Sequence, residues 1–85
     1  MEKAKAFLEM LAKAIVDKPD EVIVDAKTDE MGVLLTLHVA EQDIGQVIGR
    51  LGSTATAMRA LLRIVGIKEG ARVNMKISDP SKDNA

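Results

Sequence analysis

Apolar residues near the start of the chain recur at the spacing of an amphipathic helix. They follow the series i, i+3, i+4, i+7, i+10 and i+11, at Ala4, Phe7, Leu8, Leu11, Ala14 and Ile15. This period predicts a helix over about residues 2–16. Pro19 ends it, because proline lacks the N–H donor and disfavours helical backbone at the residue before it.

Two strands are predicted next, since the period changes from the helical one to alternation. The β-branched run EVIVDAK, residues 21–27, reads as a strand, and TDEMG, residues 28–32, reads as a turn. VLLTLHV, residues 33–39, then places Val33, Leu35, Leu37 and Val39 on one face. A half-buried second strand joined to the first in a hairpin is the expected structure.

The helical period returns from Glu41. Ile44, Val47 and Ile48 fit a short helix that ends at Gly49. A longer helix is expected to open near Gly52–Ser53 and to close at Gly66, with one apolar stripe formed by Leu51, Ala55, Met58, Leu62 and Val65. ARVNMKI, residues 71–77, alternates again and is predicted to be a third strand.

The predicted order is therefore α-β-β-α-α-β, an α+β fold. Its three-stranded sheet is expected to carry the helices packed on one face, which gives a short chain one contiguous core. Residues 1–78 are interpreted as a single domain. Residues 79–85, DPSKDNA, are interpreted as a flexible C-terminal tail. The core must be aliphatic, because Phe7 is the only aromatic residue.

Composition narrows the classes of function. The chain has no cysteine and a single histidine, His38, so neither a disulfide framework nor a metal site is expected. No apolar run approaches the roughly 18 residues of a membrane span, and the N-terminus does not resemble a signal peptide, so a cytoplasmic protein is expected. Nucleotide-binding and catalytic motifs are absent from the sequence. We expect no cofactor and no enzymatic activity.

Charge is distributed unevenly along the chain. The net charge is −1, but residues 1–40 carry five Lys/Arg and eight Asp/Glu, whereas residues 41–85 carry seven and five. The two halves therefore have net charges of −3 and +2, and all four arginines lie in the second half. This asymmetry directs attention to the glycine-bearing segment between the last two predicted helices.

That segment, VIGRLG at residues 47–52, places Gly49 and Gly52 around Arg50 and Leu51. A G-x-x-G turn between helices permits backbone conformations closed to other residues and lets a second backbone approach closely. The following helix presents its N-terminus, with unpaired N–H groups and the positive end of its dipole, to a phosphate. Arg50 adds a charged donor at the loop tip.

With its order of elements, VIGRLGSTATAMR resembles the G-x-x-G loop and flanking helices of a KH domain. The additional helix and strand at residues 2–28 resemble the type II, prokaryotic arrangement. Over about residues 2–78 the chain is similar to small bacterial single-KH RNA-binding proteins of the KhpA type. This resemblance implies a loop that clamps about four nucleotides of single-stranded RNA. It also implies an RNA chaperone or post-transcriptional regulator, homodimerisation, and pairing with a larger KH-containing protein.

Several candidate site residues have two interpretations. Leu51 stands where KH loops often carry a polar residue. If its side chain is exposed, the loop keeps a single charge, and if it turns inward, it extends the apolar stripe of the following helix. We favour partial burial of Leu51. Gly45 is expected to serve close packing. Ser53 and Thr54 are expected to cap the helix or donate to a phosphate. Arg59 either lies on a solvated face or contacts a phosphate.

Three functional hypotheses follow. In the first, bases lie over an aliphatic groove of Ile44, Val47 and Ile48 while the RNA backbone crosses the Gly49–Gly52 loop. In the second, the chain is a KH-like protein-interaction scaffold with weak or no nucleic-acid binding, which the acidic first half and Leu51 favour. The third is binding of single-stranded DNA in the same groove.

Overall fold

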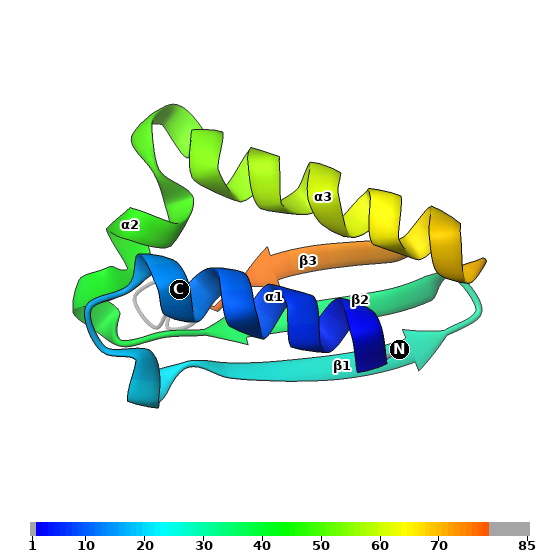
Figure 1. Ribbon diagram of the computed structural model, residues 1–85, viewed down its shortest axis with the longest axis horizontal. Helices are drawn as coiled ribbons and strands as arrows, with labels where there is room; N and C mark the ends of the chain where they lie inside the picture. The colour runs from blue at the N-terminus through cyan, green and yellow to red at the C-terminus, as the bar shows by residue number, and fades with distance from the viewer. Residues whose placement is uncertain (1, 79–85) are drawn as a thin grey trace.

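A computed structural model describes residues 2–78 and has the predicted order of elements (Figure 1). The residues predicted to form a C-terminal tail, 79–85, lie outside the described part. Short 3-10 turns at Pro19–Glu21, Glu41–Asp43 and Arg50–Gly52 connect the main elements. These are α1 (Glu2–Ile15), β1 (Ile23–Asp29), β2 (Gly32–His38), α2 (Ile44–Ile48), α3 (Ser53–Glu69) and β3 (Val73–Ile77).

The three strands form one sheet in the order β1-β2-β3. β1 and β2 pair antiparallel, with Asp29 opposite Gly32, so the predicted hairpin is confirmed. Its turn is tighter than the predicted five-residue loop, because Asp29 Oδ1 accepts a hydrogen bond from the Met31 N–H at 2.8 Å. β3 pairs parallel to β2, and α2 and α3 form the connection between them. β2 is thus the central strand.

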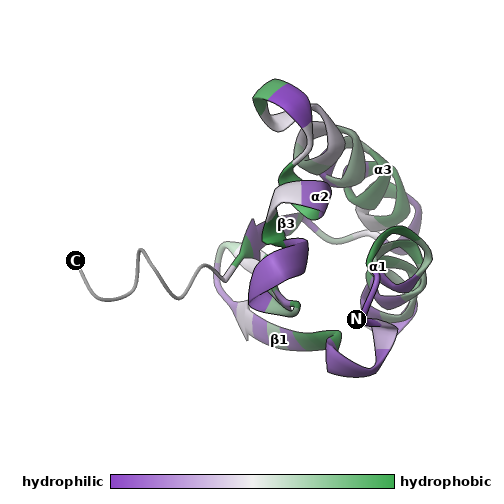
Figure 2. Ribbon diagram, turned by 90° about the vertical axis from the view of Figure 1, so that its left-hand side faces the viewer, coloured by the Kyte–Doolittle hydropathy of each residue, from purple (hydrophilic) through white to green (hydrophobic). Residues whose placement is uncertain are grey.

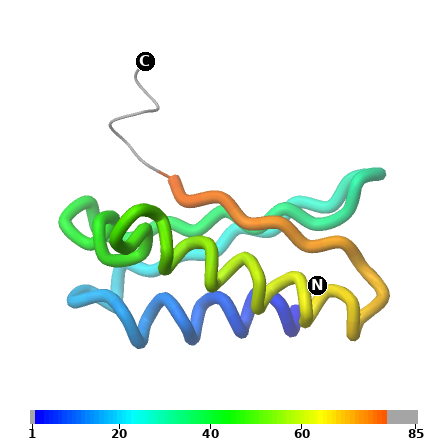
Figure 3. Tube along the Cα trace, turned by 90° about the horizontal axis from the view of Figure 1, so that it is seen from above, coloured from blue at the N-terminus to red at the C-terminus, as the bar shows by residue number. Residues whose placement is uncertain are grey.

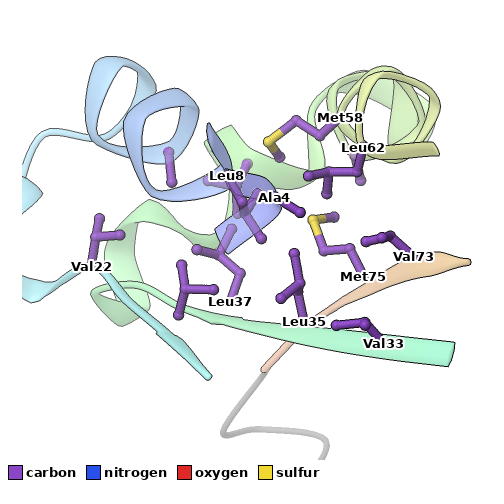
Figure 4. Packing of buried hydrophobic residues seen from close by; sticks show 14 of the residues in the cluster. Ala4, Leu8, Val22, Val33, Leu35, Leu37, Met58, Leu62, Val73 and Met75 are labelled. Carbon is purple, nitrogen blue, oxygen red and sulfur yellow. The ribbon is translucent and has the colours of Figure 1, made fainter. Parts of the chain in front are cut away.

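The helices pack on one face of the sheet, as predicted. Viewed along the long axis, α1 and α3 lie side by side over that face (Figure 2), and the view from above shows the two running next to each other (Figure 3). Alternate residues of β2 point into the core between the layers. Figure 4 shows Leu35 and Leu37 of β2 beneath Leu8 of α1 and Leu62 of α3, all four fully buried.

The prediction that Gly66 closes α3 is wrong. The helix continues to Glu69 and ends at Gly70, whose N–H reaches the carbonyl of Gly66 and that of Ile67. Gly66 is instead buried inside the helix, where an added Cβ would lie 2.7 Å from the Ala71 carbonyl oxygen. Its role is the close approach of α3 to the turn that leads into β3. Both glycines satisfied the sequence pattern, and only packing distinguishes them.

Asp43 is the one buried charged residue among those described, at 1 % exposure. Its carboxylate accepts hydrogen bonds from the backbone N–H of Asp17 at 3.3 Å and of Lys18 at 3.0 Å. The carboxylate therefore ties the loop after α1 to the start of α2. Because α2 carries the glycine-bearing loop, Asp43 holds the base of that loop in place.

Candidate nucleic-acid interface

The loop between α2 and α3 projects from one end of the molecule (Figure 1). It begins at Gly49, whose φ of 76° and ψ of 176° are a combination that is essentially restricted to glycine. A Cβ at this position would also collide with Thr54, whose backbone N would lie 2.7 Å away. Gly49 is therefore required twice, by its own backbone angles and by the close approach of the first turn of α3.

Leu51 adopts a left-handed backbone conformation, with φ of 55° and ψ of 28°, and Gly52 follows with φ of 77°. Leu51 is the only non-glycine residue with positive φ among those described. Its side chain is completely exposed, at 101 % of the reference area. The expectation of partial burial is wrong, because the left-handed residue turns its Cβ away from the stripe of α3.

Backbone hydrogen bonds close the loop. The Gly52 N–H donates to the Gly49 carbonyl at 3.2 Å, and the Ser53 N–H donates to the Arg50 carbonyl. Neither Ser53 nor Thr54 caps α3, since the helix has no side-chain cap and its N-cap position is Gly52. The predicted cap is therefore wrong: the left-handed Gly52 starts the helix without help from a hydroxyl. The N-terminus of α3 keeps its orphan N–H groups free of side-chain acceptors.

The predicted aliphatic groove is largely internal. Val47 is fully buried in the core, and Ile44 is buried at 8 % exposure. Ile48 is half-buried beside the loop. We therefore correct the interpretation of Ile44 and Val47 as surfaces for bases: they anchor α2 to the core, and of the three only Ile48 offers a substantial surface next to the Gly49–Gly52 loop.

Gly45 does not serve close packing. It lies on the exposed face of α2, and a Cβ added there would meet no atom within 4 Å. The short helix directs Val47 and Ile44 towards the core, which leaves Gly45 facing solvent. The expectation of a packing glycine is wrong.

Arg59 spans the space between α3 and β3. Its Nε donates to the carbonyl oxygen of Met75 at 3.2 Å, in partly buried surroundings. Both interpretations of Arg59 assumed a side chain directed at solvent or at a ligand, whereas in this structure the guanidinium group also links the helix to the outer strand. The sequence carried no signal of this contact, because it joins a side chain to a backbone atom 16 residues away.

The chain segment that carries the loop is positively charged. Residues 44–68, which comprise α2, the loop and nearly all of α3, contain three arginines and one lysine and no acidic residue. The ion pairs within residues 2–78 do not include any of these four cations. They are Lys3–Glu69, Lys13–Glu9, Lys18–Glu21 and His38–Asp25. None of the four arginines is neutralised by a carboxylate in the described structure.

Other chemistries have little support in the described structure. Residues 2–78 contain no group of three or more His, Cys, Asp or Glu side chains placed to hold a metal ion. No helix in this range has the length and hydropathy needed to cross a bilayer. His38 contacts Asp25, with 2.9 Å between Nε2 and Oδ2, on the sheet face opposite the helices.

Comparisons with known proteins agree with this geometry. A protein named RNA-binding protein KhpA from Clostridium acetobutylicum is 44 % identical to this chain, over 86 % of this chain and 97 % of the relative. A protein of the same name from Borreliella burgdorferi is 39 % identical, over 86 % of this chain and 89 % of the relative. The Mycobacterium tuberculosis protein of that name is 44 % identical over 85 % and 89 %. No solved structure gives a significant match.

The family model described as "KhpA/KhpB, KH domain" matches residues 5–77. The matched range includes the whole sheet and leaves out only the first residues of α1. The type of domain expected from the loop and the order of elements is confirmed. So is the expectation of a protein that is not an enzyme. The chain belongs to the KhpA/KhpB KH-domain family.

Proposed function

We propose that this protein binds single-stranded RNA and that the Gly49–Gly52 loop holds the RNA backbone. The observation that carries the proposal is the loop itself: glycine-restricted angles at Gly49, next to an uncapped helix N-terminus and the exposed, unpaired Arg50. The relatives' printed name, RNA-binding protein, supports the same function.

The loop suits a phosphate for electrostatic and steric reasons. Without Cβ atoms at Gly49 and Gly52, a phosphodiester can approach the backbone closely. The positive end of the α3 dipole and the Arg50 guanidinium group then favour its charge. Bases have no aromatic side chain to stack on, since Phe7 is the chain's only aromatic residue and lies on α1. The contacts still available to the bases are aliphatic contact with Ile48 and hydrogen bonds to base edges. RNA binding should therefore be weak and tolerant of sequence.

The affinity for RNA is expected to depend on salt. If two or three phosphates are neutralised, log affinity should fall with log salt at a slope of about −1.5 to −2. A fluorescence-anisotropy titration with random-sequence RNA, between about 50 and 200 mM salt, measures this slope. A parallel titration with single-stranded DNA shows whether the sugar matters. Absence of RNA binding at the lower salt, with retained binding to a protein partner, would instead establish the interaction scaffold.

In the cell we propose that the protein acts in the cytoplasm as an RNA chaperone or post-transcriptional regulator. A weak, sequence-tolerant clamp fits such a role, because it can bind many transcripts and release them. Pairing with a larger KH-containing protein is part of this proposal. Two linked KH modules raise the effective concentration of the second binding step, so that weak sites together hold one RNA firmly.

Self-association is proposed on the outer face of α3. This helix is apolar on two sides: Ala55, Met58 and Leu62 enter the core, while an outer stripe is exposed. The outer stripe follows i, i+3, i+4 and i+7 at Ala57, Ala60, Leu61 and Ile64. Leu61 is 42 % exposed and Ile64 62 % exposed. A second copy of α3 would bury the outer stripe of both chains.

The variant Ile64→Glu is expected to convert a wild-type dimer to monomer. It places a charge in the centre of the proposed interface, and burial of an unpaired carboxylate opposes association. Sedimentation-velocity ultracentrifugation measures the mass of both proteins. Met10→Glu is the matched control, because Met10 is 58 % exposed on α1 and should leave the mass unchanged. A monomeric wild type at high concentration, or a dimeric Ile64→Glu variant, contradicts this interface.

A further inference from the structure

β3 is an edge strand whose outer side carries backbone groups that do not pair with β2. At its two ends, the Arg72 carbonyl accepts from the Val33 N–H at 2.8 Å, and the Ser78 N–H donates to the Leu37 carbonyl at 2.9 Å. Alternate residues of a strand direct their polar groups to opposite sides, so Val73 and Met75 turn theirs away from β2. The bond from Arg59 to the Met75 carbonyl agrees with this pattern. The carbonyl and N–H of Val73 lie on the same outer edge.

A hollow of about 530 Å³ lies at the start of this edge, between β3 and the C-terminal half of α3. It is lined by the apolar residues Ile67, Ala71 and Val73 and by the polar residues Arg63, Arg72 and Asn74. Its volume lies within the roughly 300–1,000 Å³ of small-ligand sites, which likewise combine apolar walls with a few polar groups. The lining suits a flat, partly apolar ring with hydrogen-bonding edges, flanked by negative charge.

The two arginines of the hollow are available to an anion. Neither Arg63 nor Arg72 has a carboxylate within 4.0 Å among residues 2–78. Asp29 and Glu30 line an adjoining hollow that shares Arg72 with this one. Their charge and the negative C-terminal end of the α3 dipole oppose a phosphate beside Arg72. Glu69 at that end is paired with Lys3 at 3.9 Å, and residues 44–68 carry no acidic side chain, so the side of Arg63 is the more favourable one for an anion.

The Gly49–Gly52 loop and the turn that leads from Gly70 into β3 lie at opposite ends of α3 (Figure 1). The residues of that turn, Gly70, Ala71 and Arg72, line the hollow. Ser53, the first residue of the helix, and Ile67 are 14 positions apart, which corresponds to about 21 Å. An RNA strand that contacts both places therefore has to span this distance in addition to the nucleotides held at the loop.

We propose that the hollow binds one further nucleotide of the same RNA strand, beyond those held at the loop. The base lies on Ile67 and Ala71, where the Asn74 amide can pair with its hydrogen-bonding groups. Arg63 and Arg72 hold the adjacent phosphates. This inference rests on the proposed RNA binding, and it predicts that affinity depends on the length of the RNA.

The test compares random-sequence RNA pools of about four and about eight nucleotides, titrated against the full chain by fluorescence anisotropy. The longer RNA offers about five registers to a four-nucleotide site, so a ratio of affinities up to about fivefold is statistical. We expect a larger ratio. Arg63→Ala and Arg72→Ala should each weaken binding of the longer RNA by about five- to tenfold and leave the shorter RNA unaffected.

Lys68→Ala is the matched control, since it removes one charge from the C-terminal part of α3, next to Ile67, without lining the hollow. It should change neither affinity by more than about twofold. Urea denaturation checks that all variants fold. The additional nucleotide site is overturned if the longer RNA binds no more than about fivefold more tightly than the shorter RNA, or if both arginine variants bind the longer RNA with the affinity of wild type. Either result leaves the loop clamp intact. Failure of both pools to bind wild type contradicts the proposed RNA binding itself.

Discussion

The double variant Arg50→Asp with Leu51→Asp is expected to bind random-sequence RNA at least about 30-fold more weakly than wild type. It removes the loop's only cation and sets two carboxylates beside the proposed phosphate. Loss of one charge-assisted contact together with new repulsion amounts to about 2 kcal/mol or more. Both side chains are exposed, and aspartate tolerates the left-handed conformation of Leu51, so the fold should be retained.

A control with the same change of net charge separates the loop from overall electrostatics. Lys5→Asp with Met10→Asp also lowers the net charge by three, at two exposed positions of α1. Anisotropy titrations of both variants, with circular dichroism to verify folding, make the comparison. Similar losses of affinity in the two variants would show that RNA responds to net charge and would argue against a clamp at the loop.

The second large effect concerns stability. Gly49→Ala is expected to lower the free energy of unfolding by about 2–4 kcal/mol. An alanine must either adopt φ and ψ values reserved for glycine or displace the first turn of α3, because its Cβ would collide with Thr54. Urea denaturation followed by circular dichroism measures the loss.

Gly45→Ala is the matched control for Gly49→Ala, four residues earlier. Gly45 lies in α2, facing open space, so alanine there should raise the free energy of unfolding by about 0.5–1 kcal/mol. Opposite signs at the two glycines are the expected result. Stabilisation by Gly49→Ala, or equal destabilisation at both positions, would contradict the assigned roles of the loop.

Periodicity predicted the elements well where one face of each is buried. In β2, Val33, Leu35 and Leu37 alternate with half-buried residues, and the hairpin follows directly from this alternation. The end of α3 was less determined, because Gly66 and Gly70 are both plausible final residues. The difference lies in tertiary contacts: Gly66 fits against the Ala71 carbonyl, and a local pattern contains no information about that distance.

The site was predictable in its motif and less so in its side chains. Gly49 and Gly52 flank the loop as their spacing indicated, with positive φ at both. Leu51 continues the apolar period of α3 and was therefore expected to be partly buried, yet one left-handed residue directs it to solvent. Arg59 and the hollow at Arg72 depend on β3 lying beside α3, which sequence spacing alone does not reveal.

The central claim is that the Gly49–Gly52 loop holds the RNA backbone. The most direct measurement is an amide chemical-shift titration of ¹⁵N-labelled wild-type protein with short random-sequence RNA. We expect the largest, saturable shifts at Gly49, Arg50 and Gly52 and in the first turn of α3. Saturable shifts confined to other surfaces, such as α1 or the sheet face that bears His38, with the loop amides unmoved, would contradict the claim.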